Sequence, residues 1–80
     1  MKINRKFRIR KDLRCHVVYF EDEGPLEMPE ASAVIIEQLR EEMTKEELLE
    51  FVRTYYPDHD ADSEVVDVVE TLQQLSLLSI

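Results

Sequence analysis

The 80-residue sequence contains one glycine, one cysteine and no tryptophan. A single glycine argues against the glycine-rich loops that hold phosphates in nucleotide-binding proteins. The lone Cys15 cannot form an intrachain disulfide, which suits a reducing compartment. No apolar run approaches the roughly 20 residues that a transmembrane helix needs, and the first residues lack the apolar segment of a secretory signal. We therefore expect a cytoplasmic protein.

Residues for metal binding or catalysis are also scarce. Cys15 and His16 are adjacent, so on a strand their side chains point to opposite faces and cannot form a zinc site or a nucleophile pair. Residues 58–62 alternate Asp as a calcium loop does, but the sixth and twelfth places of that loop are Ser63 and Val69 rather than Gly and Glu. We expect no metal, no cofactor and no enzymatic activity.

The charges are unevenly placed along the chain. Residues 1–14 hold seven of the ten Lys and Arg residues with one acid, whereas residues 15–80 hold three basic residues against seventeen acids, for a net charge of −8. An acidic body repels the phosphate backbone of nucleic acids and attracts basic peptides or a basic protein surface. We therefore expect a basic partner for most of the chain.

Two strands are predicted near the beginning of the sequence. Residues 6–10 alternate charged and apolar side chains, which is the period of a half-buried strand. Phe7 and Ile9 are expected to face inward. Residues 15–20 are apolar on both faces and rich in β-branched and aromatic side chains, so they form a central strand. Residues 1–4 are expected to be a loose terminus.

A third strand is predicted after an acidic turn at residues 21–24. Gly24 is expected to supply the positive φ that a tight hairpin needs. Residues 25–28 then form a short strand, and Pro25 suits its first residue at a sheet edge, because proline cannot donate a hydrogen bond to a neighbouring strand. The expected sheet is an antiparallel meander whose last strand has an open edge.

From residue 29 onward the apolar residues recur at helical spacing. We predict helices over residues 29–42, 45–55 and 63–75. Thr44 and Glu47 form a capping box at the start of the second helix. Strands followed by helices indicate one α+β domain over residues 1–80, winged helix-turn-helix-like in outline. The last apolar residues are expected to pack back on the core: Leu77, Leu78 and Ile80.

The whole pattern resembles the PqqD-like family of peptide-recognition domains. The resemblance covers about residues 6–80 and rests on the pattern and spacing of these segments: 7–9, 15–19, 26–28, 33–39, 44–55, 67–68 and 72–75. It implies a domain that binds the leader region of a ribosomally synthesised precursor peptide. It also implies that the domain presents this leader to a modifying enzyme, a radical S-adenosylmethionine (radical SAM) enzyme or a leader peptidase, in peptide natural-product biosynthesis. A chain of this length is expected to be free-standing.

In that family the leader adds as a strand beside the third strand and the third helix. We therefore expect Leu26, Glu27 and Met28 to pair with the leader, since main-chain hydrogen bonds supply the affinity of strand addition. The third helix is apolar over more than one face. We expect it to supply the floor of the groove with Val65, Val66 and Val69, and its rim with Glu70 and Gln73.

Two other functions fit the same outline. A winged helix that binds nucleic acid is opposed by a third helix with Glu64, Asp67 and Glu70 and no basic residue. A small adaptor that holds enzyme subunits together is the other alternative. A monomer and a dimer that exchanges strands through residues 21–24 are both compatible with the sequence.

Overall fold

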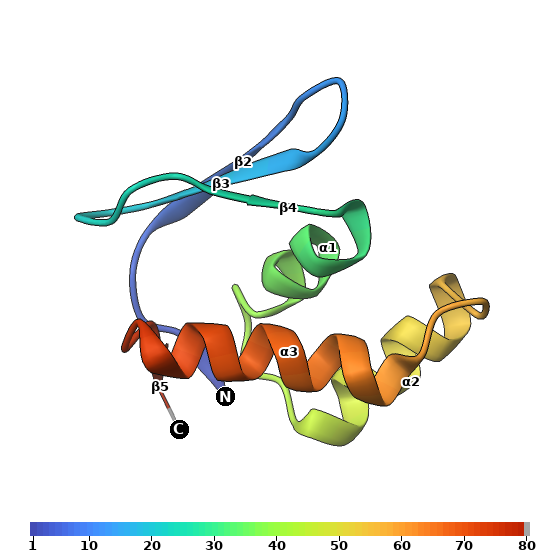
Figure 1. The fold of residues 1–80 in the computed structure, drawn as a ribbon. Coiled ribbons are helices and arrows are strands. Elements are labelled where there is room, and N and C mark those ends of the chain that lie inside the picture. The colour runs from blue at the N-terminus through green and yellow to red at the C-terminus, as the bar shows by residue number, and fades with distance from the viewer. Residues whose placement is uncertain (80) are drawn as a thin grey trace.

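The computed structural model describes residues 1–79 of the chain (Figure 1). Strands and helices follow in the order β1 Lys2–Ile3, β2 Phe7–Lys11, β3 His16–Phe20, β4 Leu26–Met28, α1 Glu30–Gln38, α2 Lys45–Tyr55, α3 Ala61–Gln74 and β5 Leu78–Ser79. The α+β class and the three predicted helices are confirmed. No helix within residues 1–79 combines the length and apolar character needed to cross a membrane.

The main sheet has the strand order β2-β3-β4, and both pairings are antiparallel. This confirms the predicted three-stranded sheet with a central second strand. Phe7 and Ile9 lie opposite Phe20 and Val18, and Phe7 and Ile9 pack against the core as predicted. The outer positions of β2 are charged and exposed, so the alternating pattern places one face of the sheet on the core and the other toward solvent.

The prediction of a loose N-terminus is wrong. β1 pairs antiparallel with β5, with Lys2 opposite Ser79 and Ile3 opposite Leu78. The Ile3 N–H also donates to the Leu39 carbonyl at 2.9 Å. Ile3 is only 5% exposed. Two residues at each end are too short for an alternating pattern to reveal the pair from the sequence.

α1 ends earlier than predicted, at Gln38 rather than near residue 42. In a longer helix the Leu39 carbonyl would accept from the N–H of Met43. Here the Leu39 carbonyl accepts from Ile3, and the Met43 N–H donates to the Met1 carbonyl at 2.9 Å. The N-terminal segment therefore takes the hydrogen bonds that would extend the helix.

The starts of α2 and α3 are determined by their caps. The capping box of Thr44 and Glu47 is present, as predicted. α3 begins two residues earlier than predicted, because the Asp60 carboxylate accepts from the Ser63 N–H and makes Ala61 the first helical residue.

α3 ends in a Schellman motif without glycine. Ser76 has a φ of 57°, in the left-handed region that usually requires glycine. The N–H of Leu77 donates to the Leu72 carbonyl at 2.9 Å, and the N–H of Ser76 donates to the Gln73 carbonyl at 3.0 Å. This turn directs Leu77 into the core, where it is fully buried. The prediction that Leu77 and Leu78 pack on the core is confirmed, and Ile80 lies outside the described residues.

The β3–β4 turn does not use its glycine as predicted. Gly24 has no positive φ; Asp22 takes that conformation instead, with a φ of 67°. The Glu23 N–H donates to the Phe20 carbonyl at 3.1 Å, which closes the turn one residue before Gly24. Aspartate tolerates the left-handed region better than most residues, because its short side chain can hydrogen-bond locally.

The molecule is layered, with α1 between the sheet and α3 (Figure 1). Its core combines residues from all three helices and the sheet, and the largest fully buried side chains are Ile35, Ile36, Leu39, Leu48, Leu72, Leu77, Val18, Val52 and Val65. Both outer strands of the sheet, β2 and β4, are unpaired on their outer edges among residues 1–79. The core thus positions two open sheet edges, and β4 lies next to α1 and α3.

Candidate functional site

A pocket of about 190 Å³ lies where β4, α1 and α3 meet. It is lined by Leu26, Glu27, Met28, Ser32, Ile36, Asp67, Val68, Thr71 and Leu72. The three residues predicted to pair with the leader, Leu26, Glu27 and Met28, thus line a pocket, and α3 supplies a wall of it. β4 and α3 thus lie side by side, as the resemblance implies.

The pocket has an apolar floor and a polar, acidic rim. Ile36 and Leu72 are 2% and 1% exposed, so they are floor residues fixed by core packing. Glu27 and Asp67 are exposed at the rim. The Thr71 hydroxyl donates to the Asp67 carbonyl at 2.8 Å. Such a pocket suits an apolar side chain in its interior and a basic group at its edge.

The hydrogen bonds of the sheet show which backbone groups of β4 face outward. The Asp12 N–H donates to the Cys15 carbonyl at 2.8 Å, so these two residues form a hydrogen-bonded pair. Bonded and non-bonded pairs alternate along an antiparallel ladder, so Arg10 and Val17 form the next bonded pair. Since the backbone of Val17 is bonded to β2, its pairing with Glu27 is a non-bonded one. The N–H and C=O of Glu27 therefore point away from the sheet.

Prolines occupy the next outward position on each side of Glu27. Pro25 and Pro29 have no N–H to offer. The Pro29 carbonyl is also occupied, because it accepts from the Ala33 N–H at 3.1 Å. The outer edge of β4 therefore presents the N–H of Glu27 together with the carbonyls of Glu27 and Pro25. A peptide can add to this edge through one fully bonded residue pair.

The predicted face of α3 does not line this pocket. Val65 is fully buried in the core. Val66, Val69 and Glu70 line a different depression of about 190 Å³, together with Met1, Lys45 and Val65. Gln73 is exposed and follows Val69 and Glu70 by one helical turn, so it belongs to that side of the helix. At 100° per residue, this side is nearly opposite the one formed by residues 67, 68, 71 and 72.

The width of the apolar stripe on α3 explains why the wrong side of the helix was predicted. The apolar stripe of α3 is wide, and helical spacing identifies the stripe without showing which of its borders faces the strand. Val68 and Leu72 are buried in the core and also form the floor of the pocket. Asp67 and Thr71 were missed because an acid and a threonine on an exposed face give no apolar signal. The helix wall of the groove is therefore formed by residues 67, 68, 71 and 72.

Cys15 lies near the rim of this site and immediately precedes β3, the strand next to β4. Burial, the Glu27 carboxylate and the Asp12 carboxylate raise the pKa of the Cys15 thiol. A raised pKa leaves less thiolate at a given pH, and the thiolate is the reactive form. We expect Cys15 to react with iodoacetamide at about pH 8 more slowly than a free cysteine peptide does. Glu27→Gln should speed the reaction, and an unchanged rate in that variant would contradict the predicted influence of Glu27 on the thiol.

The polar loop before α3 is occupied by local contacts. Asp60 caps the helix, and His59 Nδ1 lies 2.9 Å from the Glu64 carboxylate. Across residues 1–79 there is no group of three or more His, Cys, Asp or Glu side chains that could hold a metal ion. The loop therefore supplies the start of α3.

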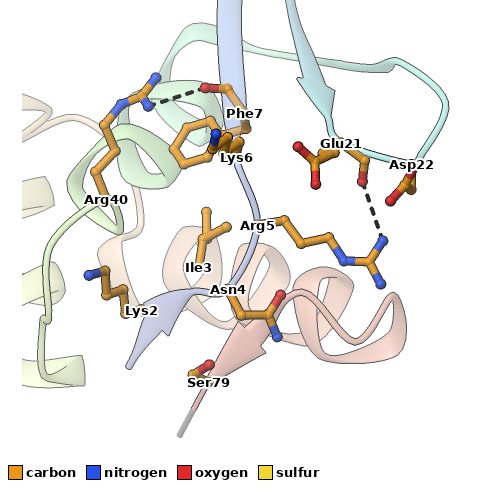
Figure 2. A pocket seen from close by; sticks show the side chains of 10 residues that line it. All are labelled: Lys2, Ile3, Asn4, Arg5, Lys6, Phe7, Glu21, Asp22, Arg40 and Ser79. Carbon is orange, nitrogen blue, oxygen red and sulfur yellow. Dashed lines mark hydrogen bonds between the residues drawn. The ribbon is translucent and has the colours of Figure 1, made fainter.

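Another hollow, of about 890 Å³, is an open basic bay at the other end of the sheet (Figure 2). We define the basic bay by its cations, Lys2, Arg5, Lys6 and Arg40. The Arg40 guanidinium lies 4.0 Å from the centre of the Phe7 ring and donates to the Phe7 carbonyl at 3.1 Å. The bay therefore begins where β2 begins.

No family model, curated protein or solved structure matches the chain. What each surface can bind is therefore inferred from its geometry and charge.

Proposed function

We propose that the protein binds the leader region of a ribosomally synthesised precursor peptide at the outer edge of β4. The observation behind the proposal is a strand edge that is unpaired among residues 1–79 and lies beside a pocket with an apolar floor and an acidic rim. Strand addition uses such an edge for main-chain hydrogen bonds and such a pocket for side chains. In this proposal the protein is a binding module rather than an enzyme, and it needs no cofactor.

The geometry of β4 defines how the peptide would lie. The peptide residue opposite Glu27 exchanges two backbone hydrogen bonds with it. Side chains of a bonded pair lie on the same face, so this residue lies beside the Glu27 carboxylate and is best Lys or Arg. Its two neighbours point to the other face, where Leu26, Met28 and the α3 wall lie. The preferred segment therefore has a basic residue between two apolar residues.

The resemblance to PqqD-like domains supports the same assignment. The resemblance implies a winged helix-turn-helix-like domain, in which a three-stranded sheet like β2-β3-β4 precedes three helices and the third helix lies beside the strand that corresponds to β4. In this proposal the domain presents the bound leader to a modifying enzyme, a radical SAM enzyme or a leader peptidase. The acidic rim favours leaders that carry Lys or Arg next to apolar residues.

A pair of lysine substitutions on α3 tests the position of the groove. We expect Thr71→Lys to weaken leader binding about tenfold, because it places a long cation in a groove that receives a basic peptide. Gln73→Lys adds the same charge on the other side of the helix and should change the affinity less than about twofold. Fluorescence anisotropy measures both, with labelled leader segments of precursor peptides encoded beside the gene.

The outcomes separate the proposal from its alternatives. If Gln73→Lys weakens binding more than Thr71→Lys, the groove lies on the face predicted from the sequence. If no such leader binds the native protein at tens of micromolar, leader recognition is excluded. Retardation of DNA in a mobility-shift assay at low salt would favour a nucleic-acid-binding winged helix. Capture of the modifying enzyme with equal yield in the absence of any leader would favour the adaptor.

A further inference from the structure

The outer edge of β2 presents a fuller set of backbone groups than the edge of β4. Arg8 and Arg10 form the bonded pairs with β3, so the N–H and C=O groups of Phe7, Ile9 and Lys11 point outward. The hydrogen bond from Arg40 to the Phe7 carbonyl shows the outward direction directly.

This edge also has no proline. The remaining outward groups of β2 have no hydrogen-bond partner among residues 1–79. β2 is five residues long against three for β4. By backbone groups alone, β2 is the better edge for adding a strand.

The side chains of β2 divide by face. On the outer face Arg8 and Arg10 are exposed, and the Arg8 guanidinium lies 5.2 Å from the centre of the Tyr19 ring. On the inner face Phe7 and Ile9 are only half-buried although they pack on the core. An added strand would therefore place every second side chain beside an arginine and the others beside an incompletely covered apolar residue.

The basic bay continues this surface beyond the first residue of β2. Figure 2 shows Lys2, Lys6 and Arg40 around the opening beside Phe7. Lys2, Arg5 and Lys6 form no ion pair with a carboxylate within residues 1–79. Four carboxylates lie among the cations of the edge and the bay: Asp12 pairs with Arg10 at 3.9 Å, Glu37 pairs with Arg40 at 2.7 Å, and Glu21 and Asp22 line the bay. Seven cations against these four acids leave a positive surface on a protein whose net charge is −8.

We propose that the outer edge of β2, together with the basic bay, is a second strand-addition site that binds an extended acidic segment of another protein. The segment alternates Asp or Glu with apolar residues. Its acids lie beside Arg8 and Arg10, and its apolar side chains lie beside Phe7 and Ile9. The site is distinct from the β4 groove and does not depend on the function proposed for it.

Charge selects this occupant over a second copy of the chain. Two copies paired through β2 would place Arg8, Arg10 and Lys11 of one copy against the same residues of the other, and like charges across a ladder are destabilising. Cations on an edge strand protect it from unspecific pairing. They repel cationic strands and attract an acidic one.

The test uses a fluorescein-labelled peptide of alternating Glu and Val, about eight residues long, so that it spans β2 and reaches the bay at about 3.3 Å per residue. The control peptide has Lys in place of every Glu. We expect the Glu peptide to bind at least about tenfold more tightly at low salt and to lose affinity as salt is raised. Equal binding of the two peptides would overturn the proposal.

Lys11 permits a matched test of the backbone. Lys11→Pro removes an outward N–H without breaking the β2–β3 ladder, whereas Lys11→Thr removes the same charge and keeps the N–H. We expect Lys11→Pro to bind the Glu peptide about tenfold more weakly than Lys11→Thr does. Equal affinities would show that binding is electrostatic without strand addition, which contradicts the proposal.

Amide NMR spectra of the unmodified protein locate the site without any variant. The Glu peptide should shift the amide signals of Phe7, Ile9 and Lys11 and slow their exchange with solvent. Changes at Glu27 with none at Ile9 would place the peptide on β4 and overturn the proposal.

Discussion

Glu27→Pro is expected to weaken leader binding about a hundredfold. The substitution removes the one N–H that the outer edge of β4 offers, and it leaves a carbonyl of the peptide without a partner. Loss of the hydrogen bond together with an unsatisfied carbonyl costs about 2–3 kcal/mol, which corresponds to a factor of about 30–150 in Kd. The N–H of Glu27 does not belong to the β3–β4 ladder, so the fold should be retained. Calorimetric titration with a bound leader measures the change.

Glu27→Gln is the matched control for this prediction. It keeps the outward N–H and removes only the charge beside the peptide. Exposed ion pairs contribute about 1 kcal/mol or less, so this variant should lose about fivefold at most. If Glu27→Pro and Glu27→Gln bind the leader equally well, the peptide does not pair with β4.

Leu77→Ala is expected to reduce the free energy of unfolding by about 3 kcal/mol. Leu77 is fully buried and lies in the hydrophobic core although it follows the last helix. Truncation of a buried leucine costs its transfer free energy and leaves a cavity, together about 2–5 kcal/mol. For a chain of 80 residues this is a large share of a net stability of about 5–15 kcal/mol. Urea denaturation followed by circular dichroism measures the loss.

Leu78→Ala is the control for the preceding result. Leu78 lies on β5 and is only half-buried, so its truncation should cost about 1 kcal/mol. A similar small loss for both variants would mean that the segment after α3 is not part of the core in solution.

Elements with a strong local signal were predictable from the sequence. The alternation in β2, the apolar β3 and the capping box at Thr44 each appear as expected. The β1–β5 pair was missed, because two-residue strands have no period and the paired residues are far apart in the chain. Ile3 and Leu78 are separated by 75 positions, and Lys2 and Ser79 by 77. The end of α1 was predicted too late for the same reason, because the Leu39 carbonyl accepts a hydrogen bond from Ile3, which is far away in the sequence.

The strand residues of the candidate site were predictable from the sequence, whereas its helix residues were not. Pro25 at the head of a short strand signalled an edge, and β4 is an edge of the sheet. The rotation of α3 about its axis depends on how α1 and α2 pack against it. The sequence pattern of α3 alone therefore does not show which side of the helix faces β4. Val66 and Val69 were therefore chosen where Asp67 and Thr71 line the pocket.

Pro25 and Pro29, on either side of Glu27, limit the number of positions at which β4 can hold the backbone of a bound chain. On an ordinary strand edge a peptide forms hydrogen bonds at several outward positions, two residues apart. On β4 the outward positions on either side of Glu27 are Pro25 and Pro29, which have no N–H, so Glu27 alone among the three can form a fully bonded pair. Any chain bound there is held at a single residue, so a later residue can move away by no more than about 3.3 Å for each position that separates the two. The number of residues between the bound residue and a distant residue therefore sets the maximum distance of that distant residue from the domain.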